Sequence, residues 1–407
     1  MAMLIAGLPL RERPKFMGII FSVFAVAISI GPVIGGLMTQ RVTWRWIFYM
    51  NLPISGAALI LLALVLKVQY KKDTARNSLK RVDFSGNALL IASVVAVLLA
   101  LTWGGTENPW SSWRILVPLI LGSLGLAAFL AIESTSLIPE PTMPLRLFSN
   151  RTSLSSFGLT FVHAILTYWI SYFLPLYFQS ALEASPTRSG VMLLPTAIAA
   201  MPFAILAGRA ISKFGHYRVW HFLGFIILMI AYGVFSMLDQ HSSSSFWIAV
   251  QFLGAAGCGV LLTTTLPAIQ APLGEEDVAV ATATWSFVRS FGGIWGVAIP
   301  AAVFNSHANS LLHRVDDEDL RNLLANGGAY AMASKEFLQS LNSTPEIKEQ
   351  VLKIPLREHL ETEFGIVAEK STPAEETGSE KTTRDAKEID TGASGTEERE
   401  EGRLKQP

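Results

Sequence analysis

The stretch ISIGPVIGGLMTQRVTWRWIFYMNLPIS, residues 29–56, places helix breakers inside one apolar run and a tryptophan–arginine cluster before the next run. Gly31, Gly35 and Gly36 fall at i, i+4 and i+5, so they are expected to share one helix face. Small residues on such a face let a second helix approach closely in lipid. Pro32 removes one backbone hydrogen bond and bends the helix. The simplest interpretation is a packing motif of a helical bundle.

The segment after the glycines, VTWRWIFYMNLP, has the composition of a membrane–water interface. Trp and Tyr are enriched at that depth. Arg45 lies between Trp44 and Trp46, where its guanidinium can stack on a ring or reach lipid headgroups. Asn51 and Pro53 are then expected to interrupt the entry of the second apolar run. Each residue alone fits an ordinary interface anchor, whereas the whole string is much rarer than its parts.

Apolar runs of this kind recur along the chain. The 407 residues are 51% hydrophobic and 16% charged, with a mean hydropathy of +0.40, whereas about a quarter of the residues of a soluble domain are charged. Runs of roughly 18 or more apolar residues can cross the hydrocarbon core as helices. The expected spans are 17–37, 46–66, 84–103, 115–132, 154–178, 189–208, 220–238, 246–268 and 280–304. The predicted fold class is an all-α polytopic membrane protein with nine transmembrane helices.

The distribution of Lys and Arg predicts the direction of these spans. The segment before residue 17 and the loops at 67–83, 133–153 and 209–219 are rich in Lys and Arg, whereas the alternate loops contain few. Positively charged loops stay in the cytoplasm, so the N-terminus is expected there. An odd number of spans then places residues 305–407 outside, although so polar a tail is more usual in the cytoplasm.

Composition argues against several other classes of protein. Cys258 is the only cysteine, so no disulfide or thiolate metal site can form, and a small buried apolar side chain is its simplest interpretation. The net charge is zero and no basic cluster contains interleaved aromatic residues, so no nucleic-acid partner is expected. The sequence contains no Ser–His–Asp set, no cluster of metal ligands and no phosphate-binding loop. We expect neither an enzyme nor a cofactor or metal site.

Several motifs together resemble one transporter family. GPVIGG followed by WRWIFYMNLP resembles the major facilitator superfamily, and more narrowly the fungal fourteen-helix drug:proton antiporters, which include mycotoxin efflux pumps. GRAISKFGHYRVW (208–220) resembles the second-half copy of the superfamily's cytoplasmic Gly–Arg loop, and TWSFVRSFGGIWGVAI (284–299) is similar to helix thirteen. The resemblance covers residues 4 to about 366.

This resemblance implies a partial major facilitator fold. The nine spans correspond to helices five to thirteen, and the absence of counterparts to the other helices predicts a truncated chain. The expected layout is a cytoplasmic segment (1–16), a remnant of the first transporter half with two helices (17–66), a linker region with two further helices (67–153), a second half with five helices (154–304), an amphipathic extramembrane segment (305–366) and a disordered polar tail (367–407).

The family implies a function as well as a fold. We expect proton-coupled efflux of small amphipathic drugs or toxins by alternating access, in which two halves rock around a midplane site. A non-transporting membrane remnant and a vacuolar amino-acid or siderophore carrier are the alternatives. The expected partners are membrane lipid, a small-molecule substrate and protons. The expected location is the plasma membrane, with the vacuolar membrane as the second possibility.

The resemblance also assigns roles to individual residues. Gly31, Pro32, Gly35 and Gly36 match the antiporter signature of helix five, and the Trp44–Arg45–Trp46 string opens helix six. The loop after Gly208 would act as a gate latch, with ordinary positive-inside topology as the simpler alternative. The residues of this gate are Gly208, Arg209, Lys213, Gly215 and Arg218.

Aromatic residues crowd the fifth span and predict a pocket for flat amphipathic solutes, although lipid-facing or core packing explains most of them equally well. The candidate substrate-binding residues are Tyr168, Tyr172, Phe173, Tyr177 and Gln179, with Gln251 and Trp285 as weaker candidates. Arg289 is the only Arg, Lys, Asp or Glu inside an expected span, and a head group that snorkels to the cytoplasmic surface is the preferred interpretation. For His163 a bond to a neighbouring carbonyl is preferred over a proton relay.

Overall fold

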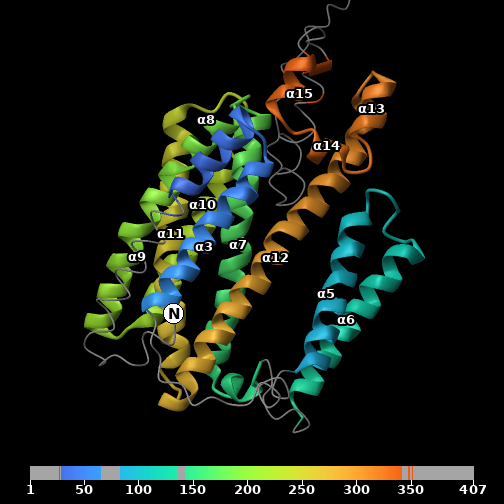
Figure 1. Cartoon of the computed structure of the whole chain (residues 1–407). Helices are drawn as coiled ribbons and strands as arrows, with labels where there is room; N and C mark the ends of the chain where they lie inside the picture. Colours follow the sequence, from blue (N-terminus) through green and yellow to red (C-terminus); the bar gives the residue numbers. More distant parts are fainter. Residues whose placement is uncertain are drawn as a thin grey trace, which may run out of the picture. The chain divides into compact units, whose positions relative to one another are not determined.

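The computed structural model of the chain describes residues 27, 29–65, 83–135, 143–341, 347, 348 and 351. Within these residues eight helical stretches are long and apolar enough to cross a membrane (Figure 1). Their helices are α3 (Arg45–Val65), α5 (Phe84–Trp103), α6 (Trp113–Glu133), α7 (Arg151–Ser180), α8 (Pro186–Met192) continued by α9 (Leu194–Phe214), α10 (Tyr217–Phe235), α11 (Ser244–Gln270) and α12 (Val278–Leu311). The predicted all-α polytopic fold is confirmed.

The first part of the first expected span (17–37), namely residues 17–26 and 28, lies outside the described residues. Its second half is described, and residues 29–41 are helical. The segments expected to be a cytoplasmic N-terminus (1–16) and a disordered tail (367–407) also lie outside the described residues.

Glycines set the closest approaches between helices. A Cβ atom at Gly259 of α11 would overlap the carbonyl oxygen of Ala200 in α9, and one at Gly296 of α12 would overlap the carbonyl oxygen of Ile165 in α7. Backbones come this close only where side chains are absent, which favours helix association in lipid. Helix α11 therefore lies against α9, α10 and α7, and it is the most buried of the described spans (Figure 1).

The glycine face of residues 29–41 differs from the prediction. Gly36 packs on the backbone of Pro186 at the start of α8, whereas a Cβ atom at Gly31 or Gly35 would meet no heavy atom within 4 Å among the described residues. Pro32 lies one turn before Gly36, and its carbonyl contacts Gly190 of α8. The packed face therefore runs through Pro32 and Gly36. Adjacent residues project about 100° apart on a helix, so Gly35 and Gly36 cannot both face α8.

Hydrogen bonds between helix ends agree with the predicted alternation of the spans. Ser153 donates to the carbonyl of Ile269 at 2.9 Å, which joins two ends expected to be cytoplasmic. The hydroxyl of Tyr177 donates to the carbonyl of Asp239 at 2.7 Å, which joins two ends expected outside. Helices that alternate in direction bring these pairs together.

The last described span is longer than expected. Helix α12 continues to Leu311, so the expected boundary between 304 and 305 falls inside a helix. After Pro300 the segment contains no residue that ends a helix, and the helix therefore outruns the apolar stretch. Short helices then follow, namely η3 (Leu312–Arg314), α13 (Glu318–Leu324), α14 (Gly328–Ala331) and α15 (Lys335–Ser340). Their apolar residues form a small core with the end of α12.

Candidate functional site

A group of polar side chains lies where α7, α11 and α12 meet. Thr167 donates to the carbonyl of His163 at 2.8 Å, and its hydroxyl lies 3.2 Å from Nε2 of the same histidine. The hydroxyl is also 3.7 Å from Sγ of Cys258, and the imidazole lies near the backbone of Cys258. Only 3% of His163 is exposed. These contacts hold the histidine ring between α7 and α11.

Arg289 faces this group from α12. It is eleven residues beyond Val278, which is roughly 16 Å along the helix. Its guanidinium carbon lies 5.6 Å from the centre of the Trp285 ring, and it interacts electrostatically with Tyr168, Cys258 and His163. The groups around the guanidinium belong to the helix contacts within the span, and the snorkelling interpretation stays a prediction.

The ring beside Arg289 is itself held in place. Trp285 donates from Nε1 to the hydroxyl of Thr265 on α11 at 3.1 Å. Tyr168 packs against Gly293 of α12, where a Cβ atom would come within 2.9 Å of the Tyr168 ring. Two aromatic residues, one on α7 and one on α12, therefore lie next to the guanidinium. We call Tyr168, Trp285 and Arg289, together with His163, Thr167 and Cys258, the intramembrane cluster.

Among the described residues the guanidinium of Arg289 makes no hydrogen bond or ion pair, and every described Asp and Glu lies outside the eight spans or at their ends. An intramembrane charge is costly and commonly marks a functional position. Electrostatics and geometry therefore favour a ligand that brings π-electron density or negative charge to Arg289. A flat organic compound with a polar or anionic group has this chemistry.

The other predicted pocket residues are dispersed. Tyr172 stacks on Tyr168, with ring centres 6.4 Å apart, but Phe173 packs on Tyr330 of α14. Tyr177 is bonded to the loop after α10, and Gln179 donates within its own helix, to the carbonyl of Pro175 at 3.4 Å. Of the aromatic candidates, the structure places Tyr168 and Trp285 beside Arg289.

Gln251 has a structural role in helix packing. It is 1% exposed, accepts a hydrogen bond from the hydroxyl of Thr196 on α9 at 2.7 Å and donates to the carbonyl of Trp247 at 3.3 Å. Its amide is thus satisfied between α9 and α11, as a buried polar group in lipid requires.

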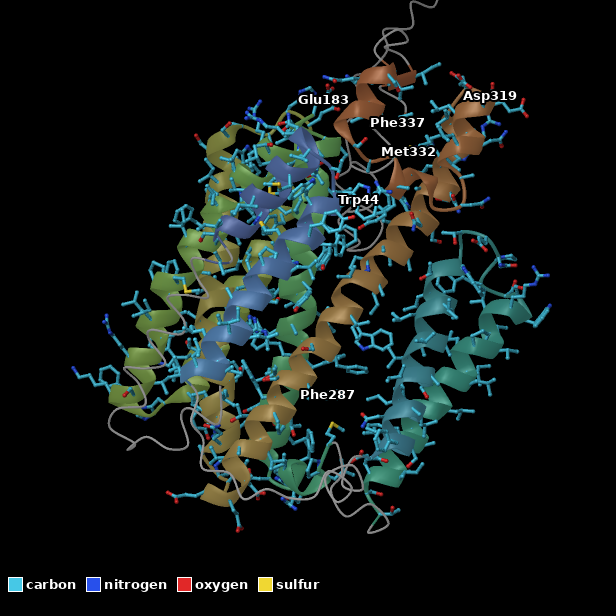
Figure 2. The ribbon with its side chains drawn as sticks, viewed as in Figure 1. Trp44, Glu183, Phe287, Asp319, Met332 and Phe337 are labelled. Carbon is cyan, nitrogen blue, oxygen red and sulfur yellow. The ribbon has the colours of Figure 1, made fainter. Side chains whose placement is uncertain are left out.

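The interface string adopts a helix instead of interrupting one. Helix α3 begins at Arg45 and runs through Asn51 and Pro53, with the Asn51 amide bonded back to the carbonyl of Ile47 at 3.1 Å. The expected interruption is wrong, because a broken backbone in lipid would leave polar groups unsatisfied. The guanidinium of Arg45 lies 4.8 Å from the ring centre of Trp44, which is labelled in Figure 2. This cation–π pair has the geometry of an interface anchor.

The expected gate loop is mostly helical. Gly208, Arg209 and Lys213 lie inside α9, which ends in a left-handed cap at Gly215 with φ 69°, and Arg218 lies in the first turn of α10. The loop itself is only residues 215 and 216, so its predicted extent is wrong. The helix continues because no residue ends it before Gly215, which adopts positive φ without strain. The gating role stays a prediction.

The sequence predicts a role for each of His163, Cys258 and Arg289 separately, and it does not predict that they lie together. The i, i+4 spacings of His163 with Thr167 and of Trp285 with Arg289 could have linked members of the cluster in advance, each pair within one helix. The cluster as a whole combines α7, α11 and α12, and no periodicity relates one of these helices to another.

The family model described as Major Facilitator Superfamily matches residues 1–297 of this chain. The chain belongs to the Major Facilitator Superfamily. It falls among the fungal efflux pumps of that superfamily: it is 45% identical over 406 residues to efflux pump FUS6 of Gibberella fujikuroi, an alignment covering 92% of this chain and 73% of that protein. It is also 50% identical over 345 residues to the MFS-type efflux pump LUC4 of a Fusarium species.

The LUC4 alignment covers 84% of this chain and 61% of LUC4. The Acurin A biosynthesis cluster MFS-type transporter of Aspergillus aculeatus is 49% identical over 348 residues, which are 85% of this chain and 62% of that protein. This superfamily member thus spans about three-fifths to three-quarters of the length of these curated relatives. A solved bacterial homologue of the human lysosomal transporter Spinster, in an inward-facing and occupied conformation, aligns with a TM-score of 0.43 and 16% identity over 88% of this chain and 81% of that chain.

Proposed function

We propose that the chain takes part in the export of small amphipathic organic compounds across the plasma membrane, by alternating access coupled to proton entry. The observation that carries this proposal is the guanidinium of Arg289, which makes no hydrogen bond or ion pair among the described residues and lies beside Tyr168 and Trp285, in a helix long and apolar enough to cross a membrane. Membership of the superfamily and identity to proteins named efflux pumps support the transport class. Proton coupling rests on the resemblance of residues 29–56 to drug:proton antiporters.

Three members of the cluster have distinct proposed roles. Arg289 binds the polar or anionic group of the cargo, and the rings of Tyr168 and Trp285 cover its flat apolar part. Movement of α12 against α7 opens the cluster to one side of the membrane at a time. The close backbone contact at Gly296 leaves few side chains to rearrange in that movement. One relative is named for a biosynthesis cluster, and we therefore include products of such clusters among the candidate cargoes.

A cell assay tests this function. Yeast depleted of its own efflux pumps and expressing the chain should accumulate a fluorescent amphipathic dye several-fold less than cells with an empty vector. A protonophore should remove the difference, because the gradient that drives export collapses. The replacement Arg114→Gln, at an exposed arginine of α6 stacked on Trp113, is expected to leave export unchanged.

The same assay separates the alternatives. If the chain reaches the cell surface and the cells accumulate as much dye as cells with the empty vector, the non-transporting interpretation is favoured. If the chain is recovered in the vacuolar membrane and vacuoles take up amino acids or siderophores, the vacuolar carrier is favoured. Either result would contradict drug efflux at the plasma membrane.

A further inference from the structure

We propose that a pocket between the first turns of α7 and α10 binds the anionic headgroup of a phospholipid from the cytoplasmic leaflet. The pocket has a volume of about 450 Å³ and is separate from the intramembrane cluster. It is lined by Arg151, Thr152, Ser155, Ser156, Leu159, Tyr217, Arg218, His221, Phe222 and Phe225. The inference does not depend on transport.

The charge of the pocket selects an anion. Arg151 begins α7, Arg218 is the second residue of α10, and both are exposed. No acidic residue is among the residues that line the pocket. Two arginines in a lining that contains no carboxylate have the charge and the side-chain chemistry with which proteins hold phosphate groups.

A buried polar atom at the pocket wall has no partner. His221 is 7% exposed, and its Nε2 makes no hydrogen bond with any residue that the structure describes. The ring lies near the backbone of Thr264 on α11. Buried polar groups without a partner are uncommon, and an absent ligand is one explanation for them. A polar headgroup in the pocket would provide the missing hydrogen bond.

Two helix N-termini converge on the same site. Helix α7 is capped by Asn150, which accepts from the backbone amide of Thr152 at 2.8 Å. Helix α10 starts after His216, whose side chain makes no capping hydrogen bond. The first amide of α10, that of Tyr217, donates to the carbonyl of Gly215 at 3.3 Å, whereas the amides of Arg218 and Val219 have no partner among the described residues. The positive ends of both helix dipoles favour an anion between them.

The walls of the pocket select a lipid instead of a free ion. Leu159, Phe222 and Phe225 form an apolar side, and Phe222 is 72% exposed. Inorganic phosphate has no apolar part that could pack against this side of the pocket, whereas the acyl chains of a phospholipid can pack there. The excess of Lys and Arg places this end of α7 and α10 in the cytoplasm, where anionic phospholipids are concentrated.

Native mass spectrometry of the full-length chain tests the site. The chain is released from nanodiscs that contain equal amounts of dioleoylphosphatidylserine and dioleoylphosphatidylcholine. We expect selective retention of phosphatidylserine. In the double variant Arg151→Gln/Arg218→Gln, affinity for phosphatidylserine should fall about 25-fold, because each cation near an anionic surface contributes a factor of about five.

The matched control removes two positive charges from the same end of the molecule, outside the pocket. The double variant Arg209→Gln/Lys213→Gln should retain as much phosphatidylserine as the unmodified chain does. If the pocket double variant fails to fold, the single variant Arg151→Gln should lose about fivefold in affinity. Equal loss in the control double variant would overturn the proposal.

Two further outcomes would also contradict the lipid assignment. One is equal retention of phosphatidylcholine. The other is displacement of phosphatidylserine by millimolar inorganic phosphate, which would show that the pocket recognises the phosphate group alone. We expect phosphate to leave the retained lipid unchanged, because it does not fill the apolar side of the pocket.

Discussion

The replacement Arg289→Gln is expected to reduce export of an amphipathic anion at least tenfold. The guanidinium is the only charge of the intramembrane cluster among the described residues and lies against Trp285 and Tyr168. Hydrogen bonds to a charged group contribute about 1.5–3 kcal/mol, which corresponds to roughly a tenfold or greater loss when the charge is removed. Initial rates of export from cells with matched surface expression measure the effect.

Stability distinguishes a transport role of Arg289 from a structural one. An unpaired cation inside a membrane-spanning segment costs free energy, so Arg289→Gln should keep or raise the unfolding temperature. A structural arginine would lower it. Arg289→Lys keeps the charge but loses the planar group that stacks on Trp285, and should give an intermediate rate. Unchanged export by Arg289→Gln would remove the arginine from the transport site.

The replacements Gly259→Ala and Gly296→Ala are expected to destabilise the bundle strongly. A Cβ atom at either position would overlap a backbone carbonyl, of Ala200 in α9 or of Ile165 in α7. A backbone cannot move aside as the end of a flexible side chain can. Overpacking of this kind costs about 1–3 kcal/mol, and sometimes more. Each variant should therefore unfold at a lower temperature and give less monodisperse protein in detergent.

Gly233→Ala is the control for this prediction. Gly233 lies in α10, and a Cβ atom there would meet nothing within 4 Å among the described residues. Alanine has a higher helix propensity than glycine, so this variant should match or exceed the unmodified chain in stability. Equal unfolding temperatures for all three glycine variants would show that these close helix contacts are absent in the protein.

The spans could be predicted because the bilayer constrains the backbone so strongly. An apolar run of sufficient length in lipid must be helical to satisfy its hydrogen bonds. The run 84–103 was expected as a span, and α5 occupies the same residues. The family could be predicted as well, because the strings around Gly36 and Trp46 are specific in combination. The match to the superfamily model confirms that identification.

Contacts between helices could not be predicted in the same way. The spacing of Gly31, Gly35 and Gly36 does not say which of them meets α8, because that depends on how the helix is rotated. Arg289 and His163 belong to helices far apart in the sequence, and their proximity follows from the packing of α12 on α7. Composition also favoured a loop after Gly208, where the structure has a continuous helix.

The central claim is that the intramembrane cluster around Arg289 binds the cargo that the chain exchanges for protons. The most direct measurement is substrate-dependent proton release from proteoliposomes that contain the purified chain and an internal pH dye, under an imposed pH gradient. The unmodified chain should move protons only when an amphipathic cargo is present on the opposite side, and Arg289→Gln should lose at least nine-tenths of this flux, which is the tenfold loss expected for its export. Proton flux that does not depend on cargo, or equal flux from both proteins, would contradict the claim.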